Sequence, residues 1–379
     1  MFVQAANGQG NGTENTPYAR TGPALAQGKS KFLGCAWSSA QETGFLNYWN
    51  QLVPENAGKW GSVEAVRDSY NWTSLDAAYH LAKDHGIPFR FHMLVWGSQQ
   101  PGWITSLPAA EQLEELEEWI SLVAHRYPDI DWLEVVNEPI SAPAPYRDAL
   151  GGTGETGWDW IINAFRLARQ YFPDTQLMIN EYGIVNDGNK RSDYMQIIRS
   201  LQSDELIDLV GVQSHAFNLT GGAANITNNL DGLATLGLPI MITELDVDGR
   251  PDPNPPDDNA AVDALSDSTQ LERIKEYFPA LIEHPAVIGV TFWGYRPGLW
   301  REKNDAHLVM ELGAQRPAME WLVDFMSRFE TMNFAEYLEA LQLDPEEHSF
   351  EADWDKDLLS TGLEYLLGFY PLIPNPFPA

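Results

Sequence analysis

The stretch Trp132-Leu-Glu-Val-Val-Asn-Glu138-Pro139 decides the fold of this chain. It is a short apolar run that ends in an acid, and a second run of the same kind, Pro239-Ile-Met-Ile-Thr-Glu244-Leu-Asp246, follows much later. Apolar runs without strict polar alternation are typical of parallel strands that are covered on both faces. The sequence therefore predicts two buried strands that carry Glu138 and Glu244 at their C-terminal ends.

Apolar runs of this length recur along the chain, and helical patterns separate them. The predicted strands are Phe32–Trp37, Tyr48–Val53, Pro88–Trp96, Asp131–Asn137, Gln176–Asn180, Leu209–Gln213, Pro239–Glu244 and Val287–Trp293. Predicted helices include Ala109–Tyr127, with Leu113, Leu116, Ile120 and Val123 on one face, and also Trp158–Phe172, Asp193–Leu201, Thr269–His284 and Pro317–Phe329. Strands that alternate with helices in this number predict an α/β fold, the (β/α)8 TIM barrel. A doubly wound open sheet stays as the alternative, because periodicity does not show closure.

The composition allows a large core and disfavours polyanionic partners. Of the 379 residues, 44% are hydrophobic, which suits one large barrel or two ordinary domains. The formal net charge is −31, so the surface should repel phosphate backbones and anionic lipids. We therefore expect no nucleic-acid partner. We also expect no membrane span, because no stretch reaches the roughly 20 apolar residues needed to cross a bilayer, and the N-terminus lacks a signal-peptide pattern.

The motifs that would indicate a cofactor or a metal are incomplete. Gly152-Thr-Gly-Glu-Thr-Gly157 has the spacing of a dinucleotide-binding loop, but no strand precedes it. The single cysteine, Cys35, lies in an apolar run and is expected to be a small buried hydrophobe. The acidic segment 246–258 lacks the ligand spacing of an EF-hand, so we expect a solvated loop. The sequence predicts no cofactor and no metal site.

The barrel domain is expected to span residues 31–329. Residues 1–30 are rich in Gly, Asn, Thr and Gln without periodicity, which predicts a flexible lead-in or linker. Residues 330–379 follow the last helical pattern of the barrel and hold a predicted amphipathic helix, Asn333–Leu343, and an apolar end. We expect this C-terminal extension to pack on the barrel rather than to form a second domain.

The two strand-end glutamates indicate a chemistry. Catalytic residues of barrel enzymes lie at the C-terminal ends of the strands. Cleavage of a glycosidic bond needs two carboxyl groups there, one to protonate the leaving oxygen and one to attack or to activate water. A single glutamate would more often be a strand-end charge that reaches solvent, but the pair, Glu138 and Glu244, favours a glycosidase.

Other predicted strand ends carry side chains that suit a sugar. Polar groups bind sugar hydroxyls, and indole rings cover the apolar faces of sugar rings. These side chains are Glu55, Asn56 and Lys59 after the second strand, His92, Trp96 and Gln99 in and after the third, and Gln213 and His215 at the sixth.

Together, these ordered motifs resemble family 10 of the glycoside hydrolases, whose typical members are endo-β-1,4-xylanases. The resemblance runs from about Phe32 to Phe329. It implies a barrel enzyme without a cofactor that cleaves β-1,4-xylosidic bonds inside xylan or xylo-oligosaccharides, with retention of the anomeric configuration by double displacement. It also implies a secreted or extracellular protein, and we expect a monomer.

The resemblance assigns a role to each candidate residue. The acid/base is Glu138, beside Asn137, and the nucleophile is Glu244, with His215 against it. The remaining positions resemble substrate contacts: Glu55, Asn56 and Lys59 toward the glycone, His92, Trp96 and Gln99 near the scissile sugar, Gln213 near the nucleophile, Tyr182 near the cleaved bond, and Trp293 and Trp300 as walls of the same subsite. The mechanism needs a protonated Glu138 and an ionised Glu244, which burial and donors such as His215 would provide.

Two positions depart from the commonest pattern of the family. Gly97 follows Trp96 where a histidine is usual, and the segment between Trp293 and Trp300 is one residue shorter than the common form. Both changes border the predicted site and affect the shape of its subsites. Two alternatives stay open: a β-1,4-glucanase on the same scaffold, because glucose and xylose differ only by a hydroxymethyl group, and a barrel that binds carbohydrate without cleaving it.

Overall fold

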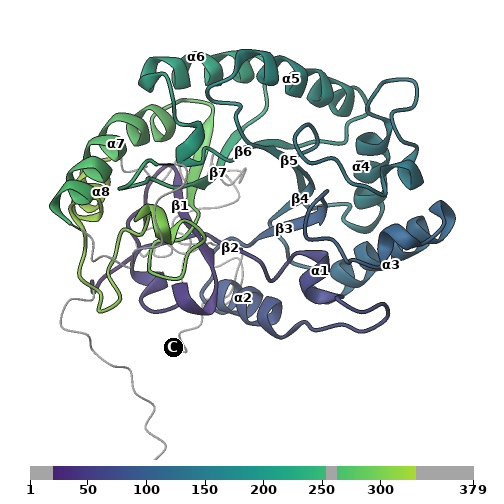
Figure 1. The fold of residues 1–379 in the computed structure, drawn as a ribbon, viewed down its shortest axis with the longest axis horizontal. Helices are drawn as coiled ribbons and strands as arrows, with labels where there is room; N and C mark the ends of the chain where they lie inside the picture. Colours follow the sequence, from purple (N-terminus) through teal and green to yellow (C-terminus); the bar gives the residue numbers. More distant parts are fainter. Residues whose placement is uncertain (1–19, 253–262, 330–379) are drawn as a thin grey trace, which may run out of the picture.

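The computed structural model, which describes residues 20–252 and 263–329, confirms the predicted barrel. Eight parallel strands form one sheet in the order β2-β1-β8-β7-β6-β5-β4-β3. The two ends of this order meet where Leu52 bridges Phe89, with the amide of Leu52 donating to the carbonyl of Pro88 at 3.0 Å. The sheet therefore closes, which excludes the open doubly wound alternative. Figure 1 shows the strands around the centre and the long helices outside them.

The strands follow the predicted runs with one exception. Their bounds are β1 Phe32–Trp37, β2 Leu52–Pro54, β3 Arg90–Val95, β4 Trp132–Asn137, β5 Gln176–Glu181, β6 Leu209–Val212, β7 Ile240–Leu245 and β8 Val287–Phe292. The prediction of a strand from Tyr48 was wrong, because a 3-10 turn, Phe45–Asn47, precedes β2 and Trp49 is buried against Phe292 and Tyr295. An apolar run is buried in a turn as readily as in a strand, so hydrophobicity misplaced this boundary.

The helices lie between the strands along the chain. They are α1 Trp60–Val63, α2 Thr73–Asp84, α3 Ala109–Arg126, α4 Asp159–Tyr171, α5 Gly188–Ser203, α6 Gly222–Ala234, α7 Ala264–Ile282 and α8 Pro317–Arg328. On α3 the predicted face is buried except for Leu113, which is 37% exposed. The helices α5 and α7 begin earlier than predicted, where the side chains of Asp187 and Asp263 accept hydrogen bonds from backbone amides of the first turn.

The barrel interior separates an apolar end from a polar end. Phe32, Met178, Leu209 and Met241, which come from the first residues of their strands, form a buried cluster of their own. Further along the same strands the buried residues include Asn180, Glu181, Thr243 and Glu244. Because parallel strands all run in one direction, the polar side chains collect at the C-terminal mouth of the barrel.

Three further predictions concern segments around the barrel. The folded part begins before Lys31, because Leu25 and Ala26 are buried and the amide of Leu25 donates to the carbonyl of Tyr48 at 3.0 Å. Residues 1–19, and 330–379 with the predicted helix Asn333–Leu343, lie outside the described residues. The loop 152–157 follows a 3-10 turn, Arg147–Leu150, and not a strand, as the sequence predicted.

The structure also bears on the single cysteine and on membrane-spanning helices. Cys35 is fully buried, as predicted, and burial raises the pKa of its thiol well above the ordinary value. No helix within the described ranges is both long enough and apolar enough to cross a membrane.

Candidate active site at the mouth of the barrel

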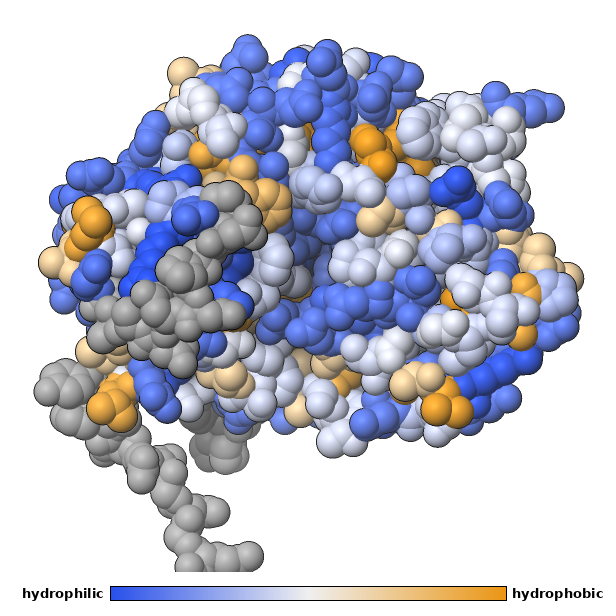
Figure 2. Space-filling model, viewed as in Figure 1, coloured by the Kyte–Doolittle hydropathy of each residue, from blue (hydrophilic) through white to orange (hydrophobic). Residues whose placement is uncertain are grey.

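A cavity of about 310 Å³ lies at the C-terminal mouth of the barrel, and Figure 2 shows a hollow near the middle of the viewed face. Residues from six of the strands and their following loops line this cavity. They are Glu55, Asn56, Lys59, His92, Trp96, Gln99, Asn137, Glu138, His215, Glu244, Trp293 and Trp300. The fold thus brings together twelve of the fourteen candidate residues; only Gln213 and Tyr182 are missing from this lining.

A chain of hydrogen bonds joins the two glutamates. Gln213 Nε2 donates to Glu138 Oε1 at 2.9 Å and to Asn137 Oδ1 at 3.1 Å. Asn180 Nδ2 donates to the same Asn137 oxygen at 3.2 Å and to Glu244 Oε1 at 2.7 Å. Sequence reasoning missed Asn180, although a polar residue at the end of the predicted fifth strand was a usable signal.

The surroundings of Glu138 favour its protonated form. Burial raises the pKa of its carboxyl group, and the charges of Glu244 and Glu181 raise it further, against hydrogen bonds from Gln213 and Trp96. The indole Nε1 of Trp96 donates to Glu138 Oε2 at 3.0 Å. The backbone of Glu138 has φ of +51°, a conformation that is strained for a side-chain-bearing residue and is often found at functional sites.

The surroundings of Glu244 favour its ionised form. Burial alone would raise the pKa of this carboxyl group, but the hydrogen bond and charge of His215 outweigh burial and lower it. His215 Nε2 lies 3.2 Å from Glu244 Oε2. The two glutamates therefore have pKa values displaced in opposite directions, which is how an acid and a nucleophile are distinguished within one site.

Asp246 contacts the ring nitrogen of His215 that does not face Glu244. Its Oδ2 lies 2.6 Å from His215 Nδ1, and its Oδ1 accepts the amide of Ala216 at 2.7 Å. Burial would lower the pKa of His215, yet the negative charge of Asp246 raises it to about 9. The imidazole is therefore a cation at neutral pH, and it forms an ion pair with the carboxylate of Glu244.

The prediction of a solvated loop from Asp246 onward was wrong for its first residues. Asp246 and Asp248 are each only 2% exposed, and both form ion pairs with Arg301. Alternation along the strand puts Asp246 on the same side as Glu244, and this was the signal that sequence reasoning missed. Residues 253–258 of the predicted loop lie outside the described residues.

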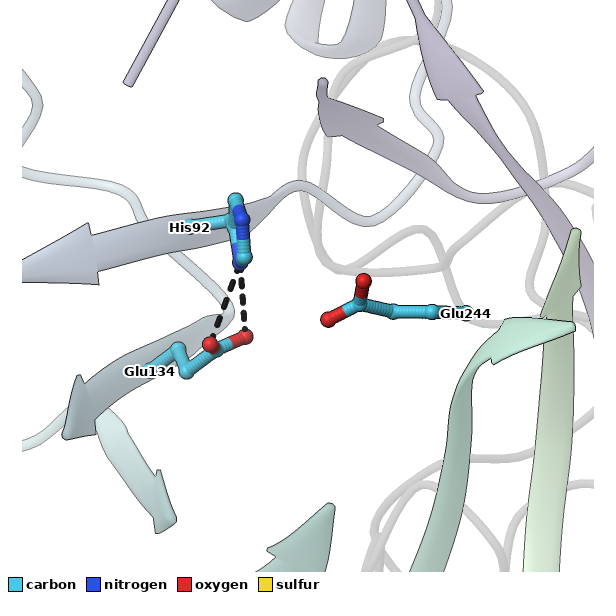
Figure 3. A group of neighbouring side chains, drawn as sticks. All are labelled: His92, Glu134 and Glu244. Atoms are coloured by element: carbon cyan, nitrogen blue, oxygen red, sulfur yellow. Dashed lines mark hydrogen bonds and ion pairs between the residues drawn. The ribbon is translucent and has the colours of Figure 1, made fainter. Parts of the chain in front are cut away.

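A buried ionic cluster forms the floor of the site, and Figure 3 shows its carboxyl groups pointing toward one another. Both carboxyl oxygens of Glu134 lie 3.1 Å from His92 Nδ1, and Arg90 Nη1 donates to Oε2 at 3.1 Å. Burial raises the pKa of Glu134 to about 7, although the charge of Arg90 opposes this, and burial lowers that of His92 well below its usual value. Sequence reasoning missed Arg90 and Glu134.

The floor has ligand atoms that would suit a metal ion. Those of His92, Glu134 and Glu244 lie within 4.8 Å of one another. Each carboxylate already has cationic or amide partners: Arg90 at Glu134, and Asn180 and His215 at Glu244. Protein donors therefore satisfy both carboxylates.

Lys59 connects the polar side chains at one edge of the cavity through hydrogen bonds. Its ammonium group donates to Asn56 Oδ1 and to Gln99 Oε1, both at 2.7 Å, and lies 5.3 Å from the ring centre of Trp96. Burial lowers the pKa of Lys59, while the neighbouring glutamates oppose this shift. Nearby, burial raises the pKa of Glu55. These groups form a fixed set of hydrogen-bond donors and acceptors at the cavity wall, of the kind that fixes the orientation of a polar ligand.

Aromatic rings form the opposite side of the cavity. Trp293 is buried edge-on to His92, at 5.1 Å, whereas Trp300 is 49% exposed and lies 4.9 Å from His215. Phe217, which sequence reasoning missed, is 45% exposed and stacks on His215 at 5.3 Å. The exposed faces of Trp300 and Phe217 are suited to cover sugar rings.

Tyr182 lies beside Phe217 and Lys190 at the edge of the site. It contacts Phe217 at a ring distance of 6.2 Å, and Lys190 Nζ lies 3.6 Å from its ring centre. Lys190 also pairs with the buried carboxylate of Glu181, at 3.0 Å. Tyr182 is thus placed beside the aromatic side of the site and not in the lining that holds the two glutamates.

Residues 19–325 match the sequence pattern of glycosyl hydrolase family 10. The chain belongs to this family. It is 37% identical over 299 residues to endo-1,4-beta-xylanase B of Cellvibrio japonicus, a match that covers 78% of this chain and 45% of that relative. It is 29% identical over 295 residues to an endo-1,4-beta-xylanase of Agaricus bisporus, which covers 74% of this chain and 84% of the relative.

Solved structures agree with the family assignment. Xylanase B from Clostridium stercorarium F9 superposes with a TM-score of 0.69 at 27% identity, over 80% of this chain and 99% of that one. A family 10 structure from Paenibacillus barcinonensis has a TM-score of 0.70 at 24% identity, over 82% of this chain and 99% of that one, and supports the barrel fold alone.

The departure from the family pattern at Gly97 has a structural cause. A Cβ atom at this position would lie 2.2 Å from the carbonyl oxygen of Ala142 and 2.5 Å from that of Pro143. The amide of Gly97 also donates to Ala142 at 3.0 Å, and the amide of Ala142 donates to the carbonyl of Glu138 at 2.8 Å. The loop after Glu138 therefore occupies the space that a side chain at position 97 would need.

Proposed function

We propose that this protein is an endo-β-1,4-xylanase that cleaves xylan with retention of the anomeric configuration. The observation that carries the proposal is the pair Glu138 and Glu244 in one open cavity, with pKa values displaced upward and downward respectively. Membership of glycosyl hydrolase family 10 supports the reaction class. The names of its relatives support xylan as the substrate. The chain spans 45% of the length of the first of these relatives. The proposal therefore concerns only the activity of this chain, and not that of a longer protein.

Glu138 acts as the acid/base in the proposed mechanism, and Glu244 acts as the nucleophile. Glu244 attacks the anomeric carbon and forms a glycosyl ester while the proton of Glu138 passes to the departing glycosidic oxygen. Glu138, now ionised, then takes a proton from water, and the water oxygen displaces Glu244 from the anomeric carbon. The two inversions give net retention. His215 keeps Glu244 charged before the attack, since the imidazolium and the carboxylate are in direct contact.

The other cavity residues bind the sugar in this proposal. Asn137 and Gln213 orient Glu138 through their hydrogen bonds, and Glu55, Asn56, Lys59, His92 and Gln99 bind hydroxyl groups on the glycone side. Trp96, Trp293 and Trp300 cover ring faces near the cleaved bond, and Tyr182 contributes from outside the lining. Binding energy from remote sugars is used to position the reacting bond between the two carboxyl groups.

We also infer the setting in which the enzyme works. The net charge of −31 disfavours nucleic acid and suits a soluble monomer that acts on a neutral polysaccharide. Because xylan is a polymer too large to enter a cell, we propose a secreted or extracellular enzyme that needs no cofactor. Residues 31–329 are the proposed catalytic domain, to whose core Leu25 and Ala26 of the preceding segment also belong, and residues 330–379 are the proposed extension that packs on the barrel.

Rates on xylan, soluble cellulose and mannan test the substrate. We expect rapid release of internal fragments from xylan and slow or no release from the others; faster hydrolysis of cellulose would assign the chain to the glucanase alternative. Proton NMR of the first products tests the stereochemistry. Early appearance of the β-anomer supports retention, whereas early α-anomer would mean that Glu244 activates water.

A further inference from the structure

Glu181 ends β5, which pairs with β4, the strand that Glu138 follows (Figure 1). The side chain of Glu181 is fully buried, and no step of the proposed mechanism uses it. A buried carboxylate is unfavourable unless cations or hydrogen-bond donors surround it. The partners of Glu181 therefore indicate what its charge does.

The carboxylate of Glu181 accepts hydrogen bonds from the loop that follows Glu138. The amides of Ile140 and Ser141 donate to Oε2 at 3.0 Å and 3.2 Å, and the hydroxyl of Ser141 donates to Oε1 at 2.8 Å. The amide of Tyr182 also donates to Oε1, at 3.0 Å. Glu181 thus fixes the first residues of the loop that leaves β4.

The backbone around Glu181 holds Glu138 as well. The amide of Glu138 donates to the carbonyl of Asn180 at 2.8 Å. The carbonyl of Glu181 accepts the amide of Gln213 at 3.1 Å, and the side chain of Gln213 donates to Glu138 Oε1 at 2.9 Å. Glu138 has φ of +51°, a conformation that persists only where its surroundings enforce it. The end of β5 supplies these enforcing contacts.

Lys190, on α5, places a positive charge beside the carboxylate of Glu181. Its Nζ lies 3.0 Å from Glu181 Oε1 and also donates to the hydroxyl of Ser141. Only 15% of the Lys190 side chain is exposed. Because solvent and salt screen buried charges much less than exposed ones, both charges reach neighbouring groups. Lys190 therefore weakens the negative field that Glu181 exerts around it.

The charged groups that act on Glu138 come from three different strands or the segments after them. Burial raises the pKa of Glu138 most, and the charges of Glu244 on β7 and Glu181 on β5 raise it further. Lys59, after β2, is a cation that interacts with Glu138 and opposes them. Glu244 and Lys59 line the cavity, whereas Glu181 does not. The charge of Glu181 can therefore be changed without altering the cavity wall.

We propose that Glu181 and Lys190 are positioning residues for the acid/base, which fix the loop after Glu138 and together set the basic pH limit of the reaction. The inference rests on the proposed function, since it assumes that Glu138 donates the proton. Neither Glu181 nor Lys190 lines the cavity, so each acts through Glu138 and its loop rather than through the sugar. The negative charge favours a protonated Glu138, and the positive charge limits this effect.

The test changes each charge separately and measures the pH above which kcat/KM on soluble xylan falls, because this limb reports the acid of the free enzyme. Glu181→Gln removes the negative charge and should move the limb to lower pH by about half to one unit. Lys190→Met removes the positive charge and should move it to higher pH by a similar amount. Within the shifted range kcat/KM changes about tenfold per pH unit. The double variant should lie between the two, and Lys190→Arg, which keeps the charge, should keep the wild-type limb.

Lys83→Met is the matched control. Lys83 is a similarly buried lysine, 16% exposed, whose Nζ pairs with Asp131 Oδ2 at 2.6 Å just before β4, at the opposite end of the barrel. Its loss should leave the limb in place. A titration of ¹³C-labelled glutamate carboxyl groups by NMR, with Glu138→Gln to identify the signal, measures the same shifts without turnover. A wild type that does not hydrolyse xylan would overturn the proposed function, whereas this titration still tests the effect of the pair on Glu138.

Opposite shifts in Glu181→Gln and Lys190→Met, with Lys83→Met at the wild-type limb, support the proposal. A limb that stays in place in both variants while kcat or Tm falls would overturn it, because the pair would then be only structural. Shifts in the same direction would also overturn it, since the two charges have opposite signs. If Glu181→Gln fails to fold, the comparison of Lys190→Met with Lys190→Arg still decides.

Discussion

His215 lies between two carboxylates, and its Nδ1 is only 2.6 Å from Oδ2 of Asp246. This contact raises the pKa of His215 to about 9, so the ring faces Glu244, the proposed nucleophile, as a cation. Asp246 does not line the cavity that holds the two glutamates, but it contacts two residues that do, His215 and Trp300, whose indole Nε1 donates to Asp246 Oδ2 at 3.3 Å. It therefore acts on catalysis through the charge of His215.

Replacing Asp246 by Asn should shift the pH dependence of the reaction. Without the negative charge of Asp246 the pKa of His215 falls, and a neutral His215 no longer holds down the pKa of Glu244. Because the nucleophile must be ionised, the acidic limb of kcat/KM moves to higher pH, with about a tenfold loss of rate per pH unit below the limb. Asp248→Asn, which removes a neighbouring partner of Arg301, is the control and should leave the limb in place. An unchanged profile in Asp246→Asn would show that another group sets the ionisation of Glu244.

The stability of the enzyme should decrease between pH 6.5 and 9, because the folded state raises the pKa of His215 from 6.5 to about 9. The folded state then binds more protons than the unfolded state in this window. The stabilisation is complete below pH 6.5 and is lost as the pH rises through 9, a change of order 3 kcal/mol. Urea unfolding across the window measures it. Asp246→Asn should flatten the slope, and an equally steep slope in this variant would assign it to other groups.

Removing the side chain of Glu244 should abolish turnover and keep the fold. Glu244→Gln cannot form the ester, so kcat should fall by at least about a thousandfold with unchanged circular dichroism. In Glu244→Gly, added azide should restore activity on a substrate with a good leaving group and give the α-azide, because azide attacks from the side that Glu244 occupied. Glu138→Gly should give the β-azide instead. A tenth of the wild-type activity in Glu244→Gln would point to another nucleophile.

A methyl group at position 97 should disturb the acid/base. In Gly97→Ala the Cβ would lie 2.2 Å from the carbonyl oxygen of Ala142, so the loop that follows Glu138 must shift. We expect a stability loss of about 1–3 kcal/mol and a lower kcat. Gly102→Ala is the matched control, because nothing lies within 4 Å of its Cβ position. Wild-type kcat and melting temperature in Gly97→Ala would mean that the loop moves without consequence for Glu138.

Deletion of residues 345–379 should affect stability more than catalysis. The barrel ends at α8, where Phe325 and Phe329 stack at 6.0 Å beside a cavity of about 670 Å³. If the apolar C-terminal segment covers this region, its loss should lower Tm by about 2–4 °C for each kcal/mol of packing lost. The kcat on xylan should stay within about twofold, because every candidate site residue precedes α8. An unchanged Tm in the truncated enzyme would contradict the predicted packing.

The sequence alone predicted the strands and most of the residues that line the cavity, but it did not show that the sheet closes into a barrel. Apolar runs predicted the strands, because a strand that is buried on both faces consists almost entirely of hydrophobic residues. Strand ends then predicted where Glu138, Glu244 and their polar neighbours meet, since all strands of a parallel barrel end at one mouth. The start of β2 escaped this reasoning, because Trp49 is as buried in a turn as it would be in a strand.

Only the tertiary structure decided which groups act on each other across the barrel. Asn180 links Asn137 to Glu244, and Asp246 charges His215, although each lies on a different strand or loop from its partner. A pKa depends on burial and on charges within a few ångströms, and neither is a property of local sequence. The order of residues thus determined the fold and the two acids, whereas the packing of distant strands determined which acid is protonated and which is charged.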